Sequence, residues 1–109
     1  MKPQSLIFAA LIGLSASPVF AAAPAVADGA TLFQGKTCWS CHGKDAKTPI
    51  LPDYPKIAGQ NAKYAEMQMR DIKSGARANG NTAAMKAIMV LVNEQEIKVL
   101  ADYLSKMKP

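Results

Sequence analysis

Both cysteines of this chain and its single histidine lie within one five-residue segment, CWSCH, at residues 38–42. The two thiols are three positions apart, and the imidazole of His42 directly follows the second thiol, Cys41. Thiolate sulfur is a nucleophile and a metal ligand, and imidazole nitrogen binds many transition metals. The segment therefore predicts a redox site, a metal site or a site of covalent cofactor attachment.

Four kinds of chemistry use these residue types, and the rest of the chain argues against three of them. A thioredoxin-like dithiol accompanies a βαβ pattern, which this sequence lacks. A structural zinc site takes four ligands, and no other Cys or His is available. A disulfide between Cys38 and Cys41 closes too short a loop to stabilise much, and it leaves His42 unexplained. The fourth is covalent attachment of a c-type haem, whose signature is C-x-x-C-H. Its thiols add to the two porphyrin vinyl groups, and its histidine binds the iron.

The second axial ligand of such an iron is expected to be a methionine, because no second histidine exists. Iron held by His and Met has a raised reduction potential that suits electron transfer. Met85 and Met89 follow a loop rich in Gly and Asn, which can carry the chain to the far haem face. Met85 is nearer this loop and is the favoured ligand. Met89 is the alternative, although methionines often fill gaps in a core. Met69 is expected in the core, and Met107 comes too late in the chain.

The first part of the 109-residue chain has the order of a secretory signal peptide. Lys2 precedes an apolar run at residues 6–14, and small residues lead to a cleavage site after Ala23. We therefore expect a signal peptide over residues 1–23, a mature domain over residues 24–109, and export to the periplasm. The apolar run is short for a bilayer, so no membrane span is expected after cleavage. A domain of this size needs more than its own core for stability, and a haem supplies it.

The charge of the chain bears on its partners. The formal net charge is +5, and the lysines are spread along the sequence without a dense basic block. Clustered positive charge is the usual sign of nucleic-acid binding, so no nucleic-acid partner is expected. A dispersed basic surface favours redox partners with acidic docking surfaces. Three lysines near CWSCH are expected to surround the haem edge: Lys36, Lys44 and Lys47.

Around these residues the sequence predicts a small all-α domain of about four helices with long loops. The helices are expected over residues 28–36, 61–74 and 82–90 and from Asn93 onward. The last is the clearest, since Asn93 and Glu96 fit a capping box and apolar residues follow at helical spacing. Three prolines deny regular structure to the loop at residues 43–59. Loops this long in so small a domain need an organising object, and the haem is that object.

Several segments stand in a recognisable order: CWSCHG (38–43), YPKIAGQ (54–60), KSG-x-R (73–77), and M-x-x-I with E-x-E-I-x-x-L-A-x-Y-L (85–104). With them, the mature chain resembles the class I cytochromes c, and within these the cytochrome c4/c553-type single-haem domains. The resemblance implies the class I cytochrome c fold and one covalent haem c per chain. Cys38 and Cys41 would form the thioethers, His42 would be the proximal ligand, and Met85 would be the axial methionine.

The resemblance also implies two contacts around the site. The carbonyl of Pro55 would accept a hydrogen bond from Nδ1 of His42, which fixes the ring and raises its basicity as a ligand. Gly29 and Phe33 of the first helix would cross the last helix near Tyr103.

The function expected from these observations is that of a periplasmic one-electron carrier, monomeric and not an enzyme, which acts between redox partner proteins. Two alternatives stay open. In the first, the chain is an electron-transfer subunit of a larger oxidoreductase complex. In the second, it is a haem enzyme or a gas sensor whose iron has an open sixth site. The latter would bind carbon monoxide in the reduced state.

Overall fold

The computed structural model describes residues 3–4, 9–15 and 25–109. The predicted signal peptide over residues 1–23 lies largely outside these residues, as does its predicted cleavage site. Within the described residues there are five helices and no strand. They are α1 (Gly29–Gly35), α2 (Trp39–His42), α3 (Ala62–Ser74), α4 (Thr82–Met89) and α5 (Glu94–Lys106). None of these helices is long and apolar enough to cross a membrane.

The all-α prediction is confirmed, and four of the helices agree closely with the predicted ranges. The difference is α2, a single turn formed by the CWSCH segment itself. It is separate from α1 because Thr37 between them has a φ of 62°, which no helix continues through. The sequence pattern could not indicate this turn, since a four-residue helix has no apolar period.

The helix ends are fixed by side chains that bond to free backbone groups. The carboxylate of Asp28 accepts from the N–H of Thr31 at 2.8 Å, and Asn61 caps α3 in the same way. The predicted capping box of Asn93 and Glu96 is present at the start of α5. Gly75, with a φ of 88°, ends α3 in the left-handed conformation that glycine adopts readily.

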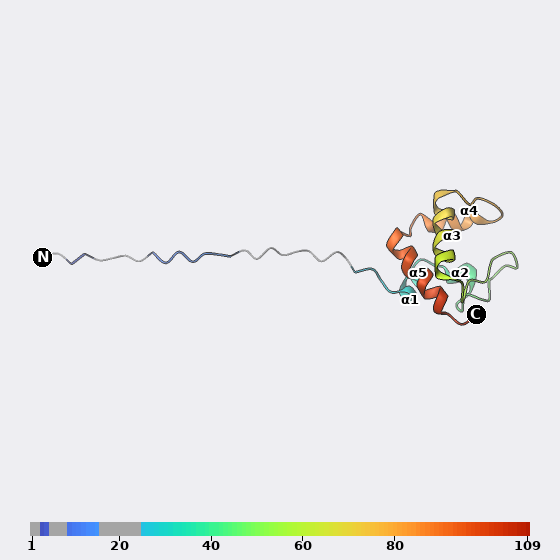
Figure 1. Ribbon diagram of the computed structural model, residues 1–109, viewed down its shortest axis with the longest axis horizontal. Coiled ribbons are helices and arrows are strands. Elements are labelled where there is room, and N and C mark those ends of the chain that lie inside the picture. Colours follow the sequence, from blue (N-terminus) through green and yellow to red (C-terminus); the bar gives the residue numbers. More distant parts are fainter. Residues whose placement is uncertain (1–2, 5–8, 16–24) are drawn as a thin grey trace.

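Three pairs of helices make the framework that positions the site: α1 against α5, α3 against α5, and α4 against α3 (Figure 1). At the first crossing, Gly29 is so close to Tyr103 that a Cβ there would overlap the tyrosine side chain. The rings of Phe33 and Tyr103 are 5.9 Å apart between centroids. The crossing that the resemblance implied is therefore present.

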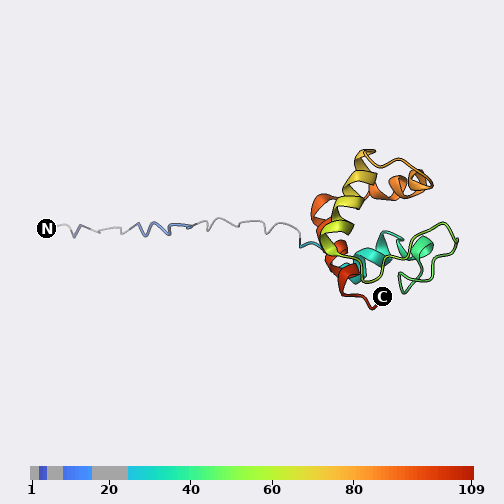
Figure 2. The same cartoon turned by 45° about the vertical axis from the view of Figure 1, so that its right-hand side comes forward.

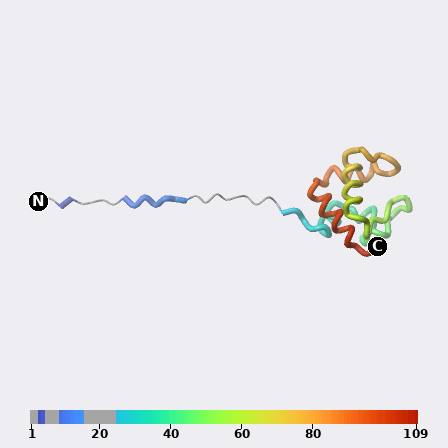
Figure 3. Tube along the Cα trace, in the orientation of Figure 1, coloured from blue at the N-terminus to red at the C-terminus, as the bar shows by residue number. Residues whose placement is uncertain are grey.

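The core lies where these helices meet, and its buried apolar side chains include Phe33, Ile72, Val92, Ile97 and Leu100. Phe33, Ile72 and Leu100 of this core also line a cavity. The loop at residues 43–59 runs away from α2 and returns to α3, as the tube in Figure 3 shows. In the turned view, α4 stands across from α2 and this loop (Figure 2).

Candidate haem-binding site

A cavity of about 460 Å³ separates α2 and its following loop from α3 and α4. Its volume lies within the usual range of about 300–1,000 Å³ for cofactor and ligand pockets. Each residue predicted for the site lines it: Cys38, Cys41, His42, Pro55, Met85 and Met89. The fold therefore brings together residues from separate helices and loops that lie far apart in the sequence.

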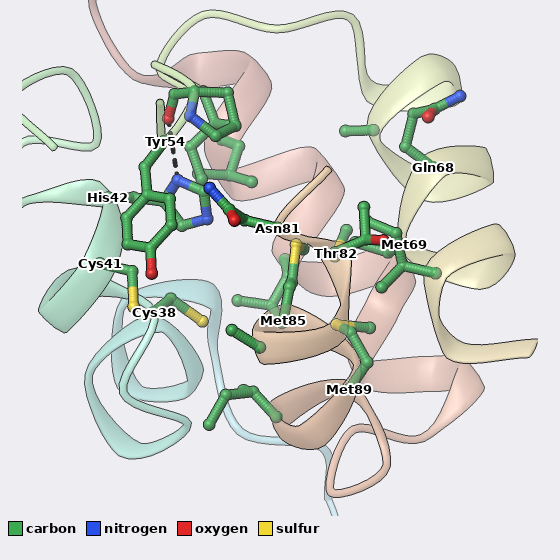
Figure 4. A pocket seen from close by; sticks show the side chains of 18 of the residues that line it. Cys38, Cys41, His42, Tyr54, Gln68, Met69, Asn81, Thr82, Met85 and Met89 are labelled. Carbon is green, nitrogen blue, oxygen red and sulfur yellow. Dashed lines mark hydrogen bonds between the residues drawn. The ribbon is translucent and has the colours of Figure 1, made fainter. Parts of the chain in front are cut away.

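His42 faces the cavity from α2 and is buried, with 8% of its surface exposed. Its Nδ1 lies 2.9 Å from the carbonyl oxygen of Pro55, to which an Nδ1–H would donate (Figure 4). That carbonyl is held in place because the N–H groups of Ile57 and Ala58 both bond to the carbonyl of Ala46. With Nδ1 occupied in this way, Nε2 is the nitrogen left to bind a metal.

The two cysteines lie at one edge of the cavity, on the same side as His42 (Figure 4). Both are free thiols and half-buried. Burial raises the pKa of Cys38 to about 11, so this thiol is protonated at neutral pH in the polypeptide alone. The short α2 helix explains the arrangement, because residues three apart in a helix share a face.

The two candidate methionines differ in their surroundings. Met85 is half-buried and extends from α4 into the cavity, on the wall opposite α2 (Figure 4). Met89 is only 3% exposed and belongs to the apolar core together with Met69. Met85 is therefore the better candidate for a metal ligand, because its thioether already points into the cavity and has to move little.

Polar residues also line the cavity, and Arg77 is one of the charged ones, with Asp53 and Lys56. Its Nη1 donates to Oε1 of Gln68 at 2.9 Å, and its Nε donates to Oδ1 of Asn79 at 3.4 Å. We did not assign Asn79 or Asn81 to the site from the sequence. The Gly- and Asn-rich composition of their loop was the only signal. Its path across the cavity mouth depends on tertiary contacts.

These residues fit a haem c. Two thiols stand at one edge, where they would attach the group. An imidazole and a thioether that would bind its iron come from opposite walls, and an arginine that lines the cavity would pair with its carboxylates.

Lys36 does not take the place that we expected for it at the haem edge. Its Nζ donates to the carbonyl of Leu91 at 2.7 Å and lies 3.4 Å from Oε2 of Glu96. The reason is that the long side chain folds back toward the start of α5, where a carboxylate neutralises it. Lys44 and Lys47 are exposed to solvent, and their place at the haem edge stays a prediction.

Helices that surround a cavity lined by C-x-x-C-H on one wall and by methionine on the other define a c-type cytochrome. This chain belongs to the cytochrome c family, whose family model, Cytochrome c, matches residues 26–108. It has the class I fold and the covalently attached haem c of that family, to whose C-x-x-C-H motif Cys38 and Cys41 conform. Electron transfer through the haem iron is the general function of c-type cytochromes.

Individual relatives support this membership. The chain is 35% identical to a cytochrome c4 of Pseudomonas aeruginosa over 71 residues, which are 65% of this chain and 33% of the relative. It is 35% identical to a cytochrome c-554(548) of Halomonas halodenitrificans over 69 residues, 63% of this chain and 82% of the relative. A thiosulfate dehydrogenase electron acceptor of Stutzerimonas stutzeri is 34% identical over 70 residues, 64% of this chain and 31% of its own length. The chain thus spans about a third of the cytochrome c4 and of the thiosulfate dehydrogenase electron acceptor.

Proposed function

We propose that this chain is a periplasmic carrier of single electrons, with one haem whose iron is held by His42 and Met85. The observation that carries the proposal is the placement of these two side chains on opposite walls of one cavity, beside both thiols. When bound, haem iron supplies reversible one-electron transfer between its two oxidation states.

The chain's own residues contribute rigidity to this process. The Pro55 carbonyl orients the His42 imidazole and strengthens it as a ligand. With Met85 bound from the other wall, the iron would have no position open to an exogenous ligand. Apolar side chains of α3 and α4, among them Ile72 and Ile88, line the same cavity and would keep water from a bound haem. Such a site changes little when the charge of its metal changes, which favours fast transfer.

Two alternatives have different support. A relative named as the electron acceptor of thiosulfate dehydrogenase favours a role beside a larger oxidoreductase, because that protein receives electrons from an enzyme. A gas sensor or haem enzyme needs an open iron position, and the position of Met85 argues against it. The test is a potentiometric titration of the purified haem protein, with carbon monoxide added to the reduced form. A carrier gives a reversible one-electron curve and no carbonyl spectrum. A carbonyl spectrum would favour the sensor or enzyme.

The periplasmic location is part of the proposal and rests on the signal-peptide pattern of residues 1–23. Covalent haem attachment in an exported domain of residues 24–109 agrees with it. The mass of the protein recovered from periplasmic extracts tests this point. We expect the mass of a chain that starts at Pro24 plus one haem. A mass that includes residues 1–23 would contradict cleavage.

We further propose that the surface of the loop after α2 docks an acidic redox partner. Ile50 and Leu51 are 64% and 46% exposed, and the N–H of Ile50 bonds to the carbonyl of Cys41 at 3.1 Å. This exposed apolar pair therefore adjoins the attachment segment. Lys44 and Lys47 stand nearby in the same loop, exposed to solvent.

Changing Lys44 and Lys47 together to Glu is expected to slow electron transfer to an acidic partner by about tenfold at low salt, since steering by charge raises association rates by about 10–1,000-fold. Stopped-flow rates measured against ionic strength check this. The control is Lys98→Glu on α5, an exposed lysine that does not line the cavity. Equal rates for the double variant and this control would contradict the proposed surface.

A further inference from the structure

We propose that Lys36 and Lys73 are positioning residues that clamp the turn after α4 and thereby hold Met85 at the iron. This inference rests on the proposed ligation by His42 and Met85. It assigns a role to two lysines that do not line the cavity.

The turn at residues 90–93 joins α4 to α5, and two lysine ammonium groups bind consecutive carbonyls in it. Lys36, at the end of α1, donates to the carbonyl of Leu91 at 2.7 Å. Lys73, in the last turn of α3, donates to the carbonyl of Val92. Hydrogen bonds from a charged donor are roughly twice as strong as neutral ones. The turn is therefore fixed from two different helices.

The Lys36 side of the clamp extends into the start of α5. Lys36 also lies 3.4 Å from Oε2 of Glu96, and the two side chains are 26% and 15% exposed. The other oxygen of Glu96, Oε1, accepts from the N–H of Asn93 at 2.9 Å. One carboxylate thus connects the lysine to the capping box, and the same network holds the carbonyl of Leu91 and the N–H of Asn93.

The position of α4 depends on this turn. The helix has only eight residues, packs on α3, and follows a loop with Gly80 and two asparagines. Its C-terminal end is anchored by Met89 and by Val92, which is 1% exposed. Met85 lies one helical turn before Met89, so a shift of this end moves its sulfur. Lys36 precedes Cys38 by two residues, which means that the clamp ties the thiol wall of the cavity to the methionine wall.

The test uses the purified haem protein with Lys36→Gln and Lys73→Gln, singly and together. Imidazole competes with a methionine ligand for oxidised haem iron, so its affinity reports how firmly Met85 is held. Each single variant is expected to bind imidazole about tenfold more tightly than wild type, the effect of about one charge-assisted hydrogen bond. The matched control is Lys63→Gln, which removes the same charge from an exposed position of α3. It is expected to leave the affinity unchanged.

Two further measurements separate positioning from general destabilisation. In the Gln variants, the far-red methionine-to-iron absorption band is expected to vanish at a lower temperature than the helical circular dichroism signal. The difference between these two temperatures is expected to be larger than in wild type. Lys73→Arg, which keeps a charged donor, is expected to restore wild-type behaviour. Should Lys73→Gln fail to fold, Lys36→Gln carries the test, because the hydrogen bond of Lys36 is exposed whereas that of Lys73 is partly buried.

The outcomes distinguish this inference from the function on which it rests. A far-red band in wild type, together with equal imidazole affinity in the Lys36, Lys73 and Lys63 variants, overturns the clamp alone. Absence of the band from wild type overturns the His42/Met85 ligation and the clamp with it.

Discussion

Replacing Cys38 and Cys41 together with serine is expected to abolish the haem-containing protein. A serine hydroxyl is a far weaker nucleophile than a thiol and does not add to a porphyrin vinyl group, so no thioether forms. We expect no haem to remain in the polypeptide after extraction with acidified acetone, where the wild-type protein retains all of it. Both cysteines are replaced together because both sulfur atoms stand at the same edge of the cavity (Figure 4).

The loss of haem is also expected to reduce the amount of folded protein. A cavity of about 460 Å³ lies beside the core, and its apolar walls would face water if nothing filled it. A domain this small is only marginally stable. The matched control is Ser40→Ala in the same segment, which removes a hydroxyl that donates to the carbonyl of Thr37 and lies 3.9 Å from Sγ of Cys41 but leaves both thiols in place. It should retain normal haem. Covalent haem in the double serine variant would contradict the assignment of the attachment site.

Replacing Met85 with alanine is expected to lower the reduction potential by on the order of 0.1 V or more, because axial ligands move haem potentials over a range of about 0.8 V. Removal of the thioether also opens one side of the iron. The reduced variant is therefore expected to bind carbon monoxide, which the wild-type protein excludes. Potentiometric titration and the spectrum of the reduced protein under carbon monoxide measure the two effects.

Met89→Ala is the matched control for this experiment, since it truncates the same side chain one helical turn away. Met89 is buried in the core, and its truncation is expected to cost about 2–5 kcal/mol in the free energy of unfolding. Its effect on the potential should be the smaller of the two. The opposite pattern, with carbon monoxide binding and a large fall in potential for Met89→Ala alone, would make Met89 the ligand.

The helices that frame the site could be predicted from local signals. Asn93 caps the last helix as the sequence predicted, and Asp28 and Asn61 cap helices whose predicted starts lie within one residue of the observed ones. The attachment motif could also be recognised from local sequence, because C-x-x-C-H places its three reactive groups within five residues. The contact between His42 and Pro55 was different. It spans 13 residues of a loop without periodicity, and only the resemblance to class I cytochromes c indicated it.

What the sequence did not indicate depends on contacts between distant segments. Proximity to CWSCH suggested that Lys36 would surround the haem edge, but its side chain reaches Leu91, 55 positions away. The asparagines at the cavity rim had no recognisable spacing either. Helix propensity and capping act within a few residues, whereas the direction of a long side chain or an irregular loop is decided by packing.

The central claim is that His42 and Met85 hold the iron of this cytochrome from opposite sides. The most direct test is the absorption spectrum of the oxidised, purified protein, recorded into the far red for wild type, Met85→Ala and Met89→Ala. We predict the methionine-to-iron charge-transfer band in wild type and in Met89→Ala, and its absence from Met85→Ala. A band that persists in Met85→Ala, or a wild-type spectrum without one, would contradict this ligation.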